Sequence, residues 1–122
     1  MGDISILSDL DECRKIWKKM IPQKGIFDLW ESRMCFYKYY KKPLHFIVSE
    51  KNGEIGGFVP LSLIEEEKGN YYGYFPGETW EGKTWLEENK IIAKDEFHAK
   101  AILDYLKDKN LKYSLRYLSP NP

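Results

Sequence analysis

The side chains best suited to contact a ligand are aromatic, and they are concentrated in one stretch of the chain. The ring-bearing residues that we assign to a ligand-binding set are Tyr72, Tyr74, Trp80 and Trp85. Strand alternation places the two tyrosines on one face, and aromatic side chains on a loop beside a sheet often line ligand pockets. Arg116 completes the set, because its guanidinium could hold a carboxylate or a phosphate. The alternative is that the rings fill a small core beneath a long loop.

No set of catalytic or metal-binding residues can be assigned. Neither His45 nor His98 accompanies the motif of a serine or cysteine nucleophile. We expect His45 to be a partly buried, hydrogen-bonded strand residue. His98 is expected at the surface, in the first turn of a helix. Cys13 and Cys35 lack metal-ligand spacing, and we expect both to be reduced thiols of the core.

Residues 77–84 match G-x-x-x-x-G-K-[ST], the phosphate-binding loop of NTPases. Such a loop wraps backbone amides around phosphates, which favours small residues inside it. Here Glu78, Trp80 and Glu81 lie inside the match, and both carboxylates would repel the phosphates. No apolar strand ending in aspartate follows to hold Mg²⁺. A P-loop NTPase is therefore only a remote alternative.

The composition indicates one globular domain. The chain has 122 residues, of which 43% are hydrophobic, and 19 basic residues balance 19 acidic ones. Zero net charge provides no long-range attraction to nucleic acid or to an anionic membrane, so we expect neither partner. No signal peptide is recognisable, and the longest apolar run is too short to cross a bilayer. We therefore expect a cytoplasmic protein.

Local patterns predict the elements that must position these residues. A short strand over 4–7 precedes a helix that begins after Ser8 or Asp9, and a second helix begins at Asp28 with Glu31 in a capping-box position. Strands follow at 44–48, 54–67 and 71–75. Asn52-Gly53 joins the first two of these strands, because a type I′ turn needs positive φ at both central residues.

The C-terminal part is expected to contain one helix and one strand. Asp95 would cap an amphipathic helix whose inner face would be Phe97, Ala101, Ile102, Tyr105 and Leu106. Residues 111–117 alternate with strand period, and residues 119–122 form a terminal tail. The predicted order is β-α-α-β-β-β-α-β. It describes a single α+β domain over 1–122, with a mixed, mainly antiparallel sheet and helices on both faces, in which the last strand runs parallel to the third meander strand.

This order of elements and several short segments resemble the GNAT (acyl-CoA N-acyltransferase) fold, in particular the N-terminal half of FemAB-like proteins. The segments are the helix bearing Trp30, the strand 44–48, the turn and strand 52–61 ending in Pro60-Leu61, and the loop 74–77. GNAT enzymes bind the pyrophosphate of acetyl-CoA on backbone amides at the start of a helix, marked by Q/R-x-x-G-x-G/A. Between Phe75 and Asp95 this pattern is absent, and acidic residues crowd the loop.

The resemblance therefore implies a GNAT-like domain that lacks its own acyl-CoA site, because the first domain of FemAB-like proteins lacks the acyl-donor site. It would bind no cofactor and would serve as a ligand-binding or assembly module. Its partner would be a small molecule or a protein, including a second copy in a homodimer. The alternative is a divergent, active acyl-CoA N-acyltransferase that uses acetyl-CoA, with Tyr74 or Tyr105 as general acid toward the CoA thiolate.

Overall fold

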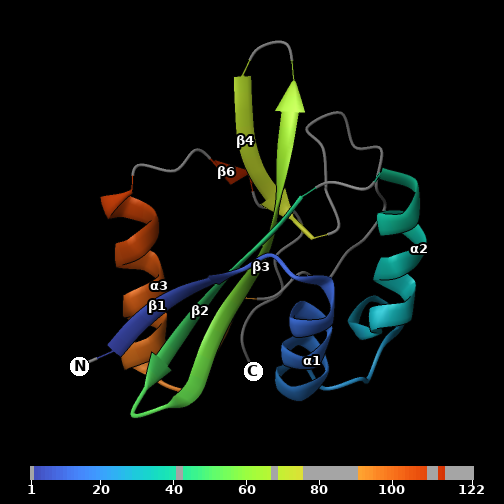
Figure 1. Ribbon diagram of the computed structural model, residues 1–122. Coiled ribbons are helices and arrows are strands. Elements are labelled where there is room, and N and C mark those ends of the chain that lie inside the picture. Colours follow the sequence, from blue (N-terminus) through green and yellow to red (C-terminus); the bar gives the residue numbers. More distant parts are fainter. Residues whose placement is uncertain (1, 41–42, 67–68, 76–90, 110–112, 115–122) are drawn as a thin grey trace.

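The computed structural model describes residues 2–40, 43–66, 69–75, 91–109 and 113–114 (Figure 1). The helices are α1 (Leu10–Met20), the 3₁₀ turn η1 (Ile26–Asp28), α2 (Trp30–Tyr40) and α3 (Glu96–Asp108). The strands are β1 (Gly2–Leu7), β2 (Leu44–Lys51), β3 (Glu54–Glu66), β4 (Gly69–Tyr74), β5 (Ile92–Ala93) and β6 (Tyr113–Ser114).

The strands form one open sheet in the order β1-β2-β3-β4-β6. All pairings along this path are antiparallel except that of β4 with β6, which is parallel, as the helical crossover between them predicts. The α+β class and the mainly antiparallel sheet are thus confirmed. The short strand β5 was not predicted. It pairs with the first half of β3, where Gly57 lies opposite Ala93.

The turn between β2 and β3 has the backbone that its sequence predicts. Asn52 has φ 54° and Gly53 has φ 78°, and Lys51 pairs with Glu54 across the turn. Asparagine and glycine tolerate this left-handed conformation better than other residues do. The turn therefore fixes the register in which the two long strands meet.

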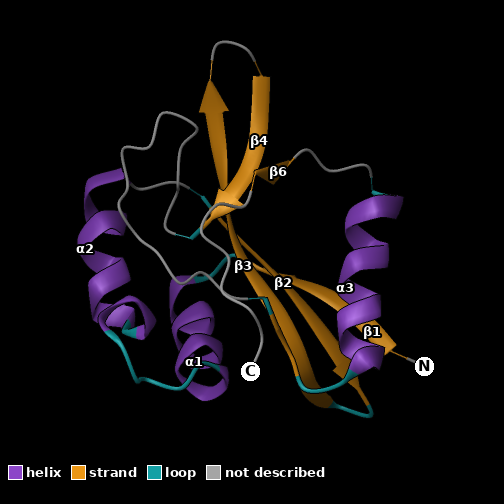
Figure 2. Cartoon of the chain, turned by 180° about the vertical axis from the view of Figure 1, so that it is seen from behind, coloured by secondary structure: helices purple, strands orange, loops and turns teal. Residues whose placement is uncertain are grey.

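The helices cover both faces of the sheet, as predicted. Figures 1 and 2 show α1 and α2 on one side and α3 on the other. Side chains that alternate along β2 divide between the two cores: Phe46 and Val48 pack with α1, whereas Ile47 packs with α3. The core beneath α3, called here the α3-side core, consists of Ile47, Val59, Leu61, Ile102 and Leu106.

The first two helices begin in different ways. Asp9 caps α1, and its carboxylate accepts a hydrogen bond of 3.1 Å from the amide of Glu12. The prediction that Asp28 begins the second helix is wrong. Asp28 closes the 3₁₀ turn instead, where its carboxylate accepts a hydrogen bond from the amide of Gly25, and α2 begins at Trp30.

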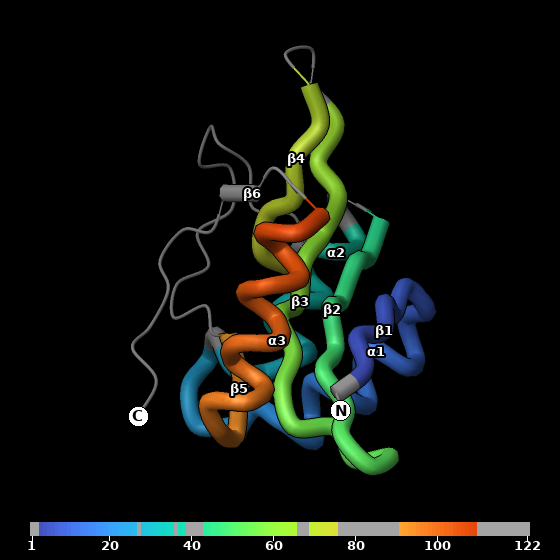
Figure 3. Tube along the Cα trace, turned by 90° about the vertical axis from the view of Figure 1, so that its left-hand side faces the viewer, coloured from blue at the N-terminus to red at the C-terminus, as the bar shows by residue number. Residues whose placement is uncertain are grey.

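The buried face of α3 also differs from the prediction. His98, Ile102 and Leu106 are buried, whereas Phe97 is 36% exposed. The expectations that Phe97 lies on the inner face and that His98 lies at the surface are therefore wrong. Figure 3 shows β5 beside the start of α3. Because β5 pairs with β3, the first turn of the helix is held close to the sheet.

The two cysteines have different environments. Both are free; Cys13 is buried, whereas Cys35 is exposed, so the expectation of two core thiols is wrong for Cys35. Burial, reinforced by the nearby carboxylates of Asp9 and Glu12, raises the pKa of the Cys13 thiol to about 12. None of the described helices has the length and apolar character needed to span a membrane.

Candidate functional site

The structure separates the two described members of the predicted ligand-binding set. Tyr72 packs against the α3-side core, whereas Tyr74 belongs to the core beneath α1 and α2. The expectation that they share a face is therefore wrong. Strand alternation fails at Tyr74 because it is the last residue of β4, where the chain turns out of the sheet at Phe75. Trp80, Trp85 and Arg116 lie outside the described residues.

Tyr74 and Phe75 are parts of an aromatic core. The ring of Phe75 is stacked on that of Trp30 at 5.0 Å, and the rings of Trp17 and Tyr74 lie edge-on at 6.4 Å. Arg33 packs against both of these rings, with its guanidinium carbon 5.2 Å from the centroids of both Trp17 and Tyr74. Tyr74 is only 1% exposed. Tyr74 and Phe75 therefore fill a core, which was the alternative to a ligand-binding role for the aromatic residues.

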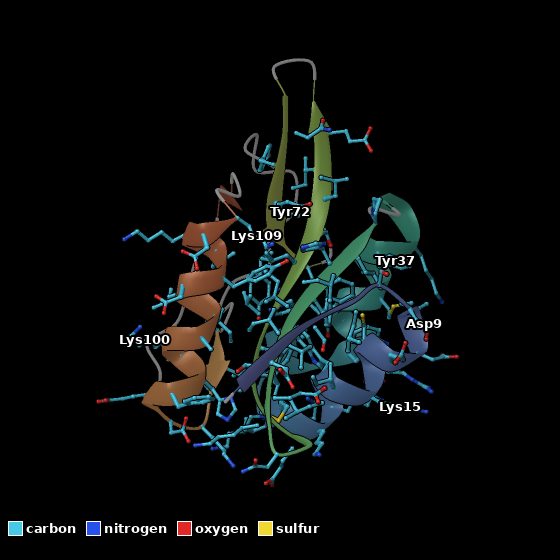
Figure 4. The ribbon with its side chains drawn as sticks, turned by 60° about the vertical axis from the view of Figure 1, so that its left-hand side comes forward. Asp9, Lys15, Tyr37, Tyr72, Lys100 and Lys109 are labelled. Atoms are coloured by element: carbon cyan, nitrogen blue, oxygen red, sulfur yellow. The ribbon has the colours of Figure 1, made fainter. Side chains whose placement is uncertain are left out.

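A different group of polar and aromatic side chains gathers on the α3 side, at the end of the sheet near β4. His45 of β2 and Tyr72 of β4 lie across β3, and their ring centroids are 4.4 Å apart. Tyr105 of α3 packs against the same core as Tyr72, and the Lys109 ammonium lies 5.9 Å from the Tyr105 ring. Figure 4 shows Tyr72 and Lys109 at this end of the face. We call these four residues the His45 patch.

His45 gives the patch its reactive atom. Its side chain is partly buried, as predicted, yet its buried Nε2 has no hydrogen-bond partner among the described residues. Desolvation lowers the pKa of the imidazole below its ordinary value of 6.5. The ring is thus neutral at pH 7. A neutral imidazole nitrogen can either donate or accept one hydrogen bond, depending on the tautomer, and here that capacity is unused.

The lowered pKa predicts a stability that depends on pH. The unfolded chain binds a proton at His45 near pH 6.5, but the folded chain does so only at lower pH. Between these two values the unfolded state holds more protons, so the free energy of unfolding should fall as the pH drops below 6.5. Urea denaturation at several pH values measures this slope. His45→Gln should flatten it, and an unchanged slope in that variant would contradict the assignment.

His98 and Ser49 form a second polar pair beneath α3. The distance from His98 Nδ1 to Ser49 Oγ is 2.8 Å, and the two residues are 1% and 0% exposed. The ring lies directly over Gly56, where an added Cβ atom would come 2.0 Å from Nε2. A serine and a histidine so fully covered cannot meet a substrate. The pair instead fastens the start of α3 to the β2–β3 hairpin.

Gly56 and Gly57 are the feature of the sequence that indicates this close contact with α3. Gly56 is the extra residue of a β-bulge, because Ser49 pairs with Gly57 while Glu50 pairs with Ile55. A bulge or a close approach of another group is the usual reason for glycines inside a strand. Here both occur: the imidazole of His98 approaches Gly56, and the carbonyl oxygen of Ile92 approaches Gly57.

The N-terminus of α3 is occupied by a carboxylate of the chain itself. Asp95 Oδ1 accepts a hydrogen bond of 3.1 Å from the amide of His98, and Glu96 adds a second acidic side chain in the first turn. The preceding amide, that of Lys94, donates to the carbonyl oxygen of Gly56 at 2.8 Å. Fewer amides are therefore available there to bind an external anion.

No protein-family model, curated protein or solved structure matches this chain. Among the described residues, no group of three or more His, Cys, Asp or Glu side chains is arranged to hold a metal ion.

Proposed function

We propose that this chain is a GNAT-like domain without an acyl-CoA site of its own, which serves as a ligand-binding module. The strand arrangement supports the fold part of the proposal. Four strands form an antiparallel run, the next strand joins β4 in parallel, and α3 makes the crossover on the face opposite α1 and α2. Apart from the additional strand β5, this arrangement supports the predicted order of elements on which the resemblance rests.

The position of Asp95 is the main observation in support of a domain without an acyl-donor site. A coenzyme pyrophosphate would need free amides and a favourable potential at the start of α3. The carboxylate of Asp95 already accepts from the amide of His98, and its charge, together with that of Glu96, opposes an anion at this position. These charges and contacts therefore favour a domain without an acyl-donor site over an active acyl-CoA N-acyltransferase.

The His45 patch supports the ligand-binding part. It combines a partly exposed aromatic face on Tyr72, the His45 ring beside it and an exposed ammonium on Lys109. A planar ligand could stack on the exposed part of Tyr72 while its acidic group pairs with the Lys109 ammonium. The cation nearby favours a ligand that carries a carboxylate or a phosphate. We therefore propose a small planar molecule with an acidic group as the ligand class.

Two NMR titrations test the proposal, with acetyl-CoA and with benzoate as the smallest probe that has a ring and a carboxylate. Benzoate should shift the His45 ring signals in a saturable manner, in the millimolar range typical of so small a ligand. Acetyl-CoA should leave the amide signals of residues 95–99 unchanged. Saturable micromolar binding of acetyl-CoA at those amides would overturn the claim that the chain lacks an acyl-donor site.

The control for benzoate is Tyr72→Leu, which keeps an apolar side chain on β4 but removes the aromatic face. It should weaken benzoate binding while His45 remains in place. If benzoate at saturating concentration leaves the His45 signals of the unmodified protein unchanged, the patch is not a site for this ligand class, whatever the outcome with acetyl-CoA.

A further inference from the structure

Strand β1 is the terminal strand of the sheet that the described residues form. In the strand order it is the terminal member, and it pairs over its whole length with β2, from Gly2 opposite Lys51 to Leu7 opposite Phe46. Among the described residues, no strand pairs with its other edge. Each such edge carries backbone N–H and C=O groups that can pair with another extended chain.

The sequence of this strand lacks several features that natural sheets use to prevent edge pairing. Such features are lysine or proline on the strand, a bulge, or several charged side chains. The sequence of β1 is Gly-Asp-Ile-Ser-Ile-Leu, with Asp3 as its one charged residue, and its pairing with β2 shows no shift in register. Ile6 is 37% exposed although it is a large apolar residue. The edge is thus suited to pairing.

We propose that two copies of this chain associate through β1, in an antiparallel pair centred on Ser5. This register places Ile4 of one copy opposite Ile6 of the other, on the face where Ile4 already packs against the α3-side core. The exposed Ile6 side chain would then be covered. Asp3 would lie opposite Leu7, so the pairing brings no two like charges face to face. Shifting the centre by half a residue toward the N-terminus would place Ile6 opposite Asp3.

The size of the contact sets its strength. Pairing two six-residue strands buries less than the roughly 1,200 Å² of stable protein–protein interfaces, so we infer a reversible dimer. Zero net charge means that two copies do not repel each other at long range. This inference is independent of the proposed ligand, because it involves neither the His45 patch nor α3's N-terminus.

Sedimentation equilibrium over a wide concentration range tests the dimer. As the concentration increases, the apparent mass of the unmodified chain should rise from the monomer mass of 14.5 kDa toward twice that value. Ile6→Lys should remain a monomer at the same concentrations, because a lysine on the edge strand blocks pairing. Leu103→Lys is the matched control: it places the same charge at an apolar residue of α3 that is 55% exposed, and it should dimerise like the unmodified chain.

A monomer mass for the unmodified chain at every concentration would overturn the proposal, as would equal dimerisation of Ile6→Lys. Cross-linking tests the register separately, in a Cys35→Ser background that removes the exposed native thiol. Ser5→Cys should form a disulfide between copies, because a residue at the centre lies opposite itself at about 5 Å between Cβ atoms. Asp3→Cys should form no such disulfide. A disulfide in Asp3→Cys but not in Ser5→Cys would overturn the register.

Discussion

Replacing Gly56 with alanine is expected to lower the free energy of unfolding by about 3 kcal/mol, the upper range for overpacking a buried site. The new Cβ would lie 2.0 Å from Nε2 and 2.2 Å from Cδ2 of His98. The imidazole cannot yield easily, because it is 1% exposed and hydrogen-bonded to Ser49. The first turn of α3 must therefore move away from the sheet. Urea denaturation followed by circular dichroism measures the loss.

His98→Ala provides the decisive partner for this variant, because it removes the ring that the new methyl group would meet. In the double variant, alanine at position 56 should cost at least 2 kcal/mol less than it does alone, a coupling of the size expected for residues in contact. Gly53→Ala is the control: no atom lies within 4 Å of its Cβ position, and only its positive φ is unfavourable. A Gly56→Ala loss that His98→Ala leaves unchanged would contradict the clash.

The Gly56 contact also bears on the functional proposal. His98 follows the cap residue Asp95 by three positions, and Lys94 donates to the carbonyl oxygen of Gly56. The same glycine that receives the imidazole therefore holds the segment that begins α3. Because that segment includes the carboxylate of Asp95, the proposal that this chain lacks an acyl-CoA site depends on this packing.

The hairpin was predictable because its determinants are local. Asn52 and Gly53 alone satisfy the turn, and the apolar runs on either side need only pair across it. The Asp9 cap of α1 is local in the same way. The buried face of α3 is not. Positions 97, 101 and 105 and positions 98, 102 and 106 both follow helical spacing, and Phe97 is the more apolar choice. The glycines about 40 residues earlier leave space for His98, and this determines which face of the helix is buried.

The candidate site was predictable only in part. Tyr72 does lie on a partly exposed face, but its neighbour is His45 rather than Tyr74. That pairing depends on which strands flank β3, and no short-range pattern reveals the desolvation that lowers the pKa of His45. Trp80, Trp85 and Arg116 lie outside the described residues, so their part in ligand binding stays a prediction.

The burial of Arg33 could not be predicted from the sequence, for a related reason. An arginine among the polar residues of a helix is normally placed at the surface, since charged side chains are almost never fully buried unless paired. Here it is 1% exposed. Trp17 comes from α1 and Tyr74 from β4, so the surroundings that accept its guanidinium are assembled only when three distant segments meet. Neither the sequence of α2 nor its spacing contains that information.

Arg33→Ala is expected to lower the free energy of unfolding by about 4 kcal/mol, a value between the costs of large-to-small core substitutions and of breaking a buried charged contact. The change empties the space that the guanidinium fills beside the Trp17 and Tyr74 rings. It also removes the donor that Nη1 provides to the Phe75 carbonyl oxygen at 3.2 Å. Since domains of this size are stable by only about 5–15 kcal/mol, thermal and urea denaturation should both show a large loss.

Two further variants separate the causes. Arg14→Ala removes an arginine that is 49% exposed and 3.9 Å from Asp11, and such a surface pair should cost less than about 1 kcal/mol. Arg33→Met restores much of the volume without the charge, so it should be more stable than Arg33→Ala while still leaving the Phe75 carbonyl without this donor. If Arg33→Ala were no more damaging than Arg14→Ala, the guanidinium could not be what holds α1, α2 and the end of β4 together.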